Sequence, residues 1–168
     1  MRQILLVIAL TLVVTPLALG QADKTAKKDK MAAPAMAEMG YYRASLIVWS
    51  TGPASLPAGA KLAVIEGDPT KAGLFTMRIM FPDGYMIQPH FHSQIEHVTV
   101  LSGKAFLGMG EKLDKTAGRE LNSGDFAFMP IGMRHFFWTE GETVIQLHGQ
   151  GPWTITYVNP QDDPRNKK

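Results

Sequence analysis

The chain has 168 residues, of which 45% are hydrophobic and 19% charged, and its net charge at pH 7 is +2. This is the composition of an ordinary globular protein with room for one domain and one core. The lysines lie mostly toward the two ends, so no basic face predicts nucleic-acid binding, and with no cysteine neither a disulfide nor a cysteine-linked lipid can form.

The first 20 residues have the pattern of an export signal. Arg2 supplies a positive charge, an apolar stretch follows from Ile4 to Val14, and Ala18-Leu19-Gly20 offers small residues to a signal peptidase. A membrane anchor is the alternative, but two threonines and a proline interrupt the stretch, and a spanning helix needs about 20 predominantly apolar residues. We therefore expect cleavage after that triplet, or after Ala22, and a periplasmic or secreted protein with no membrane association once cleaved.

The rest of the chain divides into three parts. Residues 21–40 are rich in Ala, Lys and Met without a strand or helix period, which predicts a disordered linker, and the polar residues 161–168 predict a flexible tail. Between them, residues 41–160 form the expected domain, with Gly, Pro and Asp between short apolar runs. We expect strands at 46–49, 61–66, 74–81, 96–101, 105–109, 126–129, 135–139, 143–148 and 153–158. Strands without crossover helices predict an all-β antiparallel sandwich or barrel.

Four residues of metal-binding type lie close together in this domain: His90, His92, Glu96 and His135. The first three have even numbers, so an extended chain would send them to one face, and His135 would come from a distant strand. Three imidazoles and one carboxylate can hold a divalent transition metal and leave positions open for water, dioxygen or a substrate oxygen.

The spacing of these residues resembles the two motifs of the cupin superfamily. The first motif is matched at every defining position by residues 84–103, GYMIQPHFHSQIEHVTVLSG, and the second as far as its histidine by residues 124–135, GDFAFMPIGMRH. Where the second motif commonly continues with asparagine, this chain has Thr139, which is not a ligand position. The resemblance extends over roughly 41–160 and implies a single-domain double-stranded β-helix, or jelly roll.

The resemblance also implies a metal cofactor, which in similar cupins is Fe, Mn, Ni, Zn or Cu. The superfamily includes dioxygenases, oxalate-degrading enzymes, isomerases, lyases and non-catalytic binders, so the fold does not select a reaction. Cupin-like chains often pair through outer strands, and we therefore expect a homodimer.

Other side chains have weaker indications. His97 has the opposite parity to Glu96 and is expected to face away from the site, whereas His148 is either a neighbour of the ligands or a surface residue. Arg134 could pair with a substrate carboxylate, but its parity favours the surface. The apolar wall of the metal's cavity is expected from residues that share the even parity, namely Val98, Val100, Phe106, Phe126, Phe128, Phe136 and Trp138.

Two functions remain open at this point. The first is a small exported metalloenzyme, an oxidoreductase of dioxygenase-like type acting on a small oxygen-rich or aromatic molecule at a centre of three histidines and one glutamate. The second is a metal-dependent binding or metal-storing protein without turnover. An accessible cavity beside the metal favours the first, and a closed pocket filled by Phe106, Phe126 and Trp138 favours the second. The catalytic residues, the substrate and the metal are not predicted.

Overall fold

The structure, a computed structural model, describes residues 39–167. The expected signal peptide and residues 21–38 of the expected linker lie outside this part of the chain. Within it, no helix is long and apolar enough to cross a membrane. The strands are β1 (Ser50–Thr51), β2 (Lys61–Glu66), β3 (Gly73–Phe81), β4 (Met86–His92), β5 (Glu96–Met109), β6 (Arg119–Asn122), β7 (Phe126–Met129), β8 (His135–Gly151) and β9 (Ile155–Tyr157), and the 3-10 turns are η1 (Ala44–Leu46), η2 (Lys115–Ala117), η3 (Pro160–Asp162) and η4 (Pro164–Asn166).

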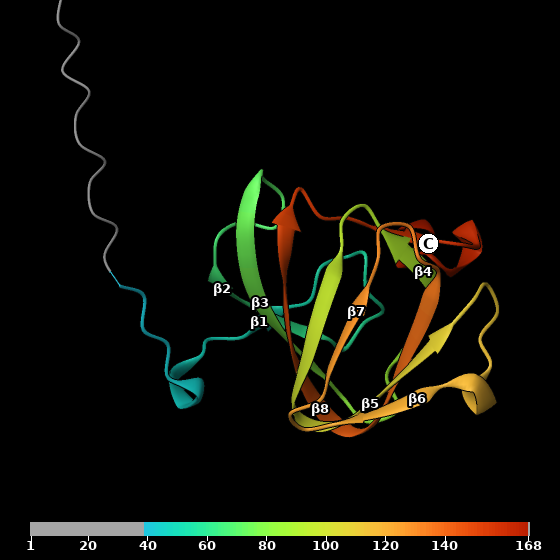
Figure 1. Cartoon of the computed structure of the whole chain (residues 1–168), viewed down its shortest axis with the longest axis horizontal. Helices are drawn as coiled ribbons and strands as arrows, with labels where there is room; N and C mark the ends of the chain where they lie inside the picture. The colour runs from blue at the N-terminus through green and yellow to red at the C-terminus, as the bar shows by residue number, and fades with distance from the viewer. Residues whose placement is uncertain (1–38, 168) are drawn as a thin grey trace, which may run out of the picture. The chain divides into compact units, whose positions relative to one another are not determined.

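The strands form one antiparallel sheet that curls upon itself, as Figure 1 shows. Its order is β1-β2-β3-β8-β4-β9, and β5 pairs with β6, β7 and β8. The 17-residue β8 joins the two halves, because its first residues pair with β4 and its last nine pair with β3. This all-β barrel agrees with the predicted jelly roll.

Alternation along the strands builds the core. In β3, the side chains of Phe75, Met77, Ile79 and Phe81 are all buried, and the residues between them are partly exposed. Successive side chains of a strand point to opposite faces of the sheet, so these four face the inside of the curl, where burial of apolar surface provides most of the stabilisation.

The two longest strands bend at glycines. Gly103 in β5 has φ 79° and Gly141 in β8 has φ 75°, in the left-handed region that glycine adopts without strain. The register between β5 and β8 shifts on both sides of Ser102, as it does at a β-bulge. The parity of the inward residues therefore changes along β5, from Val98 and Val100 before the bend to Ala105 and Leu107 after it.

Several elements differ from the predicted ones. The strand expected at 46–49 is replaced by η1 and the two-residue β1, and β6 was not predicted, while β4 was expected only as part of an extended stretch that continued to Glu96. The strands expected at 135–139 and 143–148 are one continuous strand, because Gly141 bends β8 without ending it.

The last described residues, 160–167, lie against the barrel near β4 and β9 (Figure 1). Asp163 caps η4 by accepting a hydrogen bond from the backbone N–H of Arg165 and is itself buried. The predicted boundaries of the domain and tail remain predictions, but residues 160–166 consist of two hydrogen-bonded 3-10 turns.

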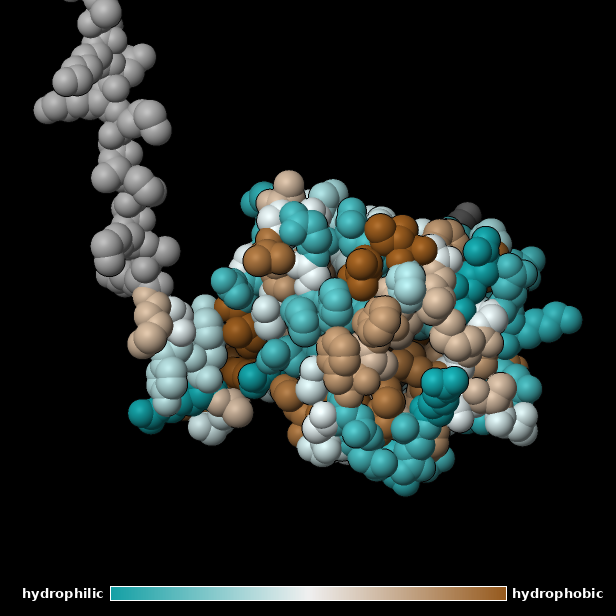
Figure 2. Space-filling view, viewed as in Figure 1, coloured by the Kyte–Doolittle hydropathy of each residue, from teal (hydrophilic) through white to brown (hydrophobic). Residues whose placement is uncertain are grey.

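Part of the outer surface is apolar. Figure 2 shows hydrophobic side chains gathered on the face in view, and the large apolar residues that are exposed on the strands and loops of the barrel include Leu74, Ile95, Phe126, Phe128 and Ile131. Exposed apolar residues are common on folded proteins and do not identify an interface by themselves, so the expected homodimer remains a prediction.

Candidate metal centre

Three strands bring the four predicted ligands together. His90 and His92 lie two residues apart on β4, Glu96 begins β5, and His135 begins β8. A turn at residues 93–95 separates His92 from Glu96, so the expectation of one extended strand through all three was wrong. They converge because β4 and β8 pair with His90 opposite His135, while the turn brings Glu96 back beside them.

The three histidines lie close to one another, and Glu96 is close to two of them. One ring nitrogen from each of His90, His92 and His135 lies within 4.8 Å of the others, and these three could hold a metal ion. Glu96 Oε2 is 3.2 Å from His92 Nε2 and 3.2 Å from His135 Nε2. Two ligand atoms that each lie about 2.1 Å from one metal are about 3 Å apart when the angle between them is near 90°. The observed spacing therefore fits adjacent corners of one coordination shell.

Backbone carbonyls orient all three imidazoles. Nδ1–H of His90 donates to the carbonyl oxygen of Gln88 at 2.7 Å, that of His92 to Thr154 at 2.9 Å, and that of His135 to Met133 at 2.9 Å. A carbonyl oxygen can only accept, so each Nδ1 carries a proton, and each Nε2 presents a lone pair when its ring is neutral. This arrangement, in which the far nitrogen of a ligand histidine is fixed by a second hydrogen bond, is typical of metal sites.

Three buried ring nitrogens have no hydrogen-bond partner among the described residues, namely His92 Nε2, His97 Nδ1 and Trp153 Nε1, and of these three only His92 Nε2 belongs to the ligand cluster. His92 Nε2 is buried and, although Glu96 Oε2 is 3.2 Å away, the direction of approach does not make a hydrogen bond. A buried nitrogen without a partner costs about 1–3 kcal/mol. A metal ion bound to this lone pair would remove that cost, which is the observation that best fits the donor set to a divalent cation.

The electrostatics of His90 and Glu96 favour the protonation states that bind metal. Burial, with additional repulsion from His135 and His92, lowers the pKa of His90 well below its ordinary value. Burial alone would raise the pKa of Glu96, but His92 and His135 outweigh it and hold this pKa well below its usual range. At neutral pH the site therefore offers a neutral imidazole and an ionised carboxylate.

A cavity of about 320 Å³ opens beside these residues. His90, His92, Glu96 and His135 form part of its lining, and most of the remaining wall is apolar. Such walls exclude water and strengthen electrostatic interactions at a metal. The cavity is lined by apolar side chains that include Leu56, Met77, Ile79, Phe81, Ile87, Val98, Leu107, Phe137, Leu147, Trp153 and Ile155.

The predicted wall was wrong apart from Val98. Phe126 and Phe128 are 52% and 59% exposed on the outside, and the ring of Trp138 is stacked on Phe106, 4.9 Å between centroids, away from the cavity lining. The even parity of His90 and His92 does not apply to β8, whose ligand is the odd-numbered His135. Phe137, two residues later on the same face, lines the cavity in place of Phe136 and Trp138.

The two remaining histidines lie together outside the cavity. His97 and His148 are opposite each other across β5 and β8, with parallel rings 5.0 Å apart. The parity of His97 predicted its place outside the cavity, but not its contact with His148. Arg134 is at the surface, where its Nε lies 2.8 Å from Glu111 Oε1. None of these three lines the cavity beside the ligands.

Three residues near the carboxyl end belong to the site and were not predicted. The carbonyl of Thr154 orients His92, and the ring of Trp153 stacks on His92 at 4.1 Å between centroids. Arg165 also lines the cavity. The expected strand at 153–158 was the only signal that this segment joins the barrel.

Comparison with known proteins agrees with this architecture. Residues 68–148 match the sequence model of the cupin family, described as "Cupin". No curated protein matches the chain.

Solved structures show the same fold. The polyketide cyclase RemF from Streptomyces resistomycificus superimposes with a TM-score of 0.63 at 17% identity, covering 76% of this chain and 91% of its own. A putative acetylacetone dioxygenase from Methylibium petroleiphilum PM1 gives 0.59 at 17% identity, with 79% and 90% covered. An RmlC-like cupin from Shewanella frigidimarina NCIMB 400 gives 0.52 at 14% identity, with 67% and 91% covered. These similarities show the fold, which is an all-β jelly roll.

Proposed function

We propose that this protein, whose central segment carries a cupin domain, is an exported metalloenzyme of oxidoreductase type. It would act on a small oxygen-rich or aromatic molecule at a metal held by His90, His92, Glu96 and His135. Nε2 of each histidine and a carboxylate oxygen of Glu96 would be the ligand atoms. The neighbour described as a putative acetylacetone dioxygenase shows that this fold accommodates proteins assigned to such chemistry.

One observation carries the proposal: three imidazoles whose Nδ1–H groups are fixed by backbone carbonyls direct their Nε2 lone pairs toward one carboxylate at the wall of an apolar cavity. A bound divalent metal would act there as a Lewis acid or as the site of dioxygen activation. The protein's own residues hold the donor atoms in place, exclude water and leave space for a small molecule. Glu96 would neutralise part of the metal's charge and would not act as a general base.

A non-catalytic metal-dependent binding protein is the second candidate. The cavity beside the ligands is not filled by Phe106, Phe126 or Trp138, so the arrangement expected for a closed structural metal is not observed. An accessible cavity supports small-molecule binding in both readings, and only turnover distinguishes an enzyme from a binder.

The proposal is tested by metal analysis followed by an oxygen-uptake panel. Protein purified from its native compartment should contain close to one transition metal per chain, and it should consume oxygen with at least one member of a panel of small acids and phenols. Glu96→Gln, which keeps the shape of the side chain but removes its charge, should reduce both. Metal without turnover on any substrate would favour the binding protein, and a chain that takes up no metal even on reconstitution would refute both.

Export and dimerisation are separate parts of the proposal. Amino-terminal sequencing of the mature protein should find its first residue after Gly20 or Ala22, and an intact Met1 would contradict export. Light scattering during gel filtration should give twice the mass of the mature chain. A monomer at micromolar concentration would contradict the expected homodimer.

A further inference from the structure

The turns at the carboxyl end place one cation at the wall of the metal cavity. Arg165 is the only lysine or arginine among the described residues that line it. Its side chain is 47% exposed, so it lies where the cavity meets solvent. A charged group at this border can meet a ligand without the large cost of complete burial.

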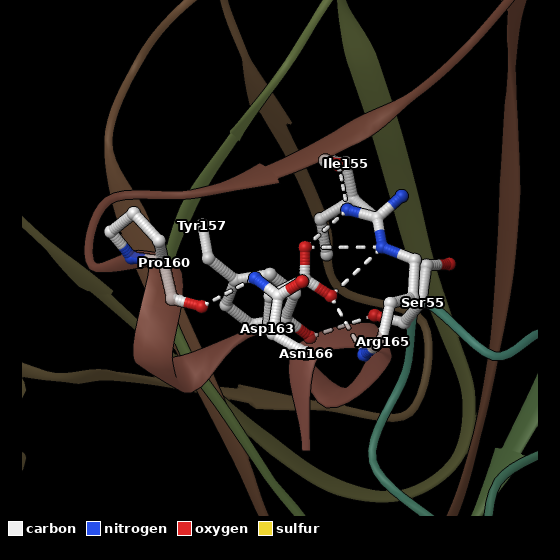
Figure 3. A network of polar contacts seen from close by, with 7 residues as sticks. All are labelled: Ser55, Ile155, Tyr157, Pro160, Asp163, Arg165 and Asn166. Carbon is white, nitrogen blue, oxygen red and sulfur yellow. Dashed lines mark hydrogen bonds and ion pairs between the residues drawn. The ribbon is translucent and has the colours of Figure 1, made fainter. Parts of the chain in front are cut away.

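The contacts of Arg165 leave one end of its guanidinium free. Nε donates to Asp163 Oδ1 at 2.8 Å, and Nη2 donates to Asp163 Oδ2 at 2.6 Å and to the carbonyl oxygen of Ile155 at 3.2 Å. Figure 3 shows this network and the second terminal nitrogen outside it. That nitrogen, Nη1, has no hydrogen-bond partner within residues 39–167.

Further hydrogen bonds fasten the turns and the strand next to Arg165. The side-chain amide of Asn166 donates to the carbonyl oxygen of Pro160 at 2.8 Å, and the hydroxyl of Tyr157 donates to that of Ser55 at 2.9 Å (Figure 3). The guanidinium itself is fixed in advance by its hydrogen bonds to Asp163 and Ile155, so a ligand would not have to immobilise it.

Arg165 is connected to the ligand histidines through its hydrogen-bond partner Ile155. Its partner Ile155 lies opposite His92 where β9 pairs with β4, and neighbouring strands are about 4.8 Å apart. Between the histidine cluster and the guanidinium, the wall includes Ile155 and Trp153. A molecule of modest size could therefore contact the metal with one end and Nη1 with the other, and its middle would lie against apolar side chains.

The charges of the cavity favour an anion. Asp163 neutralises Arg165, the three imidazoles are neutral when bound, and a divalent metal with Glu96 leaves about one net positive charge. A guanidinium nitrogen with free N–H groups binds carboxylate oxygens with directed hydrogen bonds. A cavity of about 320 Å³ is at the small end of ligand pockets, enough for about one substituted ring.

We propose that Arg165 is the specificity residue of this cavity and that the natural ligand is a small carboxylic acid with an apolar body, bound by Nη1 at its carboxylate and by the metal at an oxygen on its other end. This inference rests on the proposed function for the metal. The alternative is that Arg165 only fastens the carboxyl end to the barrel, which accounts for Nε and Nη2 but leaves Nη1 without a role.

The test uses Zn²⁺-loaded mature protein under nitrogen, so that binding is measured without turnover. The probes are catechol, 3,4-dihydroxybenzoate and methyl 3,4-dihydroxybenzoate, which share the metal-chelating end, and dissociation constants come from isothermal titration calorimetry. The acid should bind about tenfold more tightly than its ester, as expected for one charged hydrogen bond at a half-exposed site.

Substitutions separate the two roles of Arg165. Arg165→Gln should remove the preference for the acid and leave catechol affinity unchanged, and Arg165→Lys should retain only part of it. Arg134→Gln, which removes the surface arginine, should retain the full preference. Each variant must match the parent in zinc content and melting temperature, and Arg165→Lys serves as the test if the glutamine variant does not fold.

The outcomes distinguish this inference from the proposed function. If catechol binds but the acid gains nothing over the ester, or if Arg165→Gln retains the gain, the role of Arg165 is refuted and the metal cavity stands. If zinc-loaded protein binds none of the three probes, both the cavity's proposed function and the role of Arg165 are refuted.

Discussion

Substitution of His135 by alanine provides the sharpest test of the metal centre. The side chain is 2% exposed, its Nδ1–H is held by the carbonyl of Met133, and its Nε2 lies 3.2 Å from Glu96 Oε2. Alanine removes one of four donors and leaves the other three in place. Because β8 is held by β3, β4 and β5, the barrel should still fold.

The expected magnitude follows from the donor count. Four-ligand structural zinc sites contribute about 10–16 kcal/mol, which is about 2.5–4 kcal/mol for each ligand. A loss of about 3 kcal/mol corresponds to affinity weakened by about 100-fold, and a loss near the upper limit to almost 1000-fold. The variant should therefore lose its metal to a chelator concentration that leaves the parent loaded.

The assay is competition with a chromophoric chelator, followed by mass spectrometry of the retained metal. His97→Ala is the matched control, since His97 lies outside the cavity and is stacked on His148. It should bind metal with the affinity of the parent. If both variants lose metal to the same extent, the reasoning that places His135 inside the site and His97 outside it is refuted.

Three further predictions concern stability and pH. Thr139→Val should lower the free energy of unfolding by about 1–3 kcal/mol, because the buried hydroxyl of Thr139 accepts from the N–H of Tyr85 and donates to the carbonyl of Pro82. In thermal melts Thr139→Ser should lose much less stability, and equal losses of stability in the two variants would contradict this role of the hydroxyl. Gly108→Ala should cost about 1–3 kcal/mol, since its new carbon would lie 2.0 Å from the buried ring of Phe136, and a chemical-denaturation midpoint equal to that of the parent would disprove the clash. Metal affinity should fall as the pH is lowered from about 8 to 5, because protons compete for the ligand nitrogens. Burial lowers the pKa of His135, but the hydrogen bond with Glu96 raises this pKa on balance, so the loss of affinity should begin above about pH 6.5 in a titration. An affinity that does not change with pH would exclude histidine ligands.

Local spacing accounts for part of the cluster. His90 and His92 are two apart in one strand, and that spacing alone places both on one face. Glu96 lies beside the histidines, but not because it shares a strand with them. The chain turns at residues 93–95 and returns to the sheet as β5, which begins at Glu96. The motif therefore encodes a turn as well as a strand, and parity counted across it agreed only by coincidence.

Parity failed where the chain changes face. The wall of the cavity was predicted by extending the even numbers of His90 into β5 and β8, but the register shifts around Ser102 invert the inward parity of β5, and β8 carries its ligand on an odd position. Bulges are set by glycines such as Gly103, whose left-handed conformation is visible only in the structure. A sequence indicates where such a glycine lies but not how many residues the register shifts.

Contacts between distant segments were beyond sequence reasoning. The carbonyl of Thr154 is 62 residues from the histidine it orients, and any residue type offers the same carbonyl. Arg165 lies in residues 161–168, a polar stretch that was expected to form a flexible tail. The ion pair with Asp163 and the carbonyl of Ile155 place it on the barrel, and neither leaves a periodic signal.

The dependence of His92 on Thr154 has a consequence for the order in which the molecule matures. A ribosome makes the carboxyl end last, so a growing chain that has just exposed His90 and His92 lacks both the carbonyl and the indole of Trp153 that later fix the second imidazole. Nascent chains should therefore capture ions poorly, and loading should follow release of the finished polypeptide.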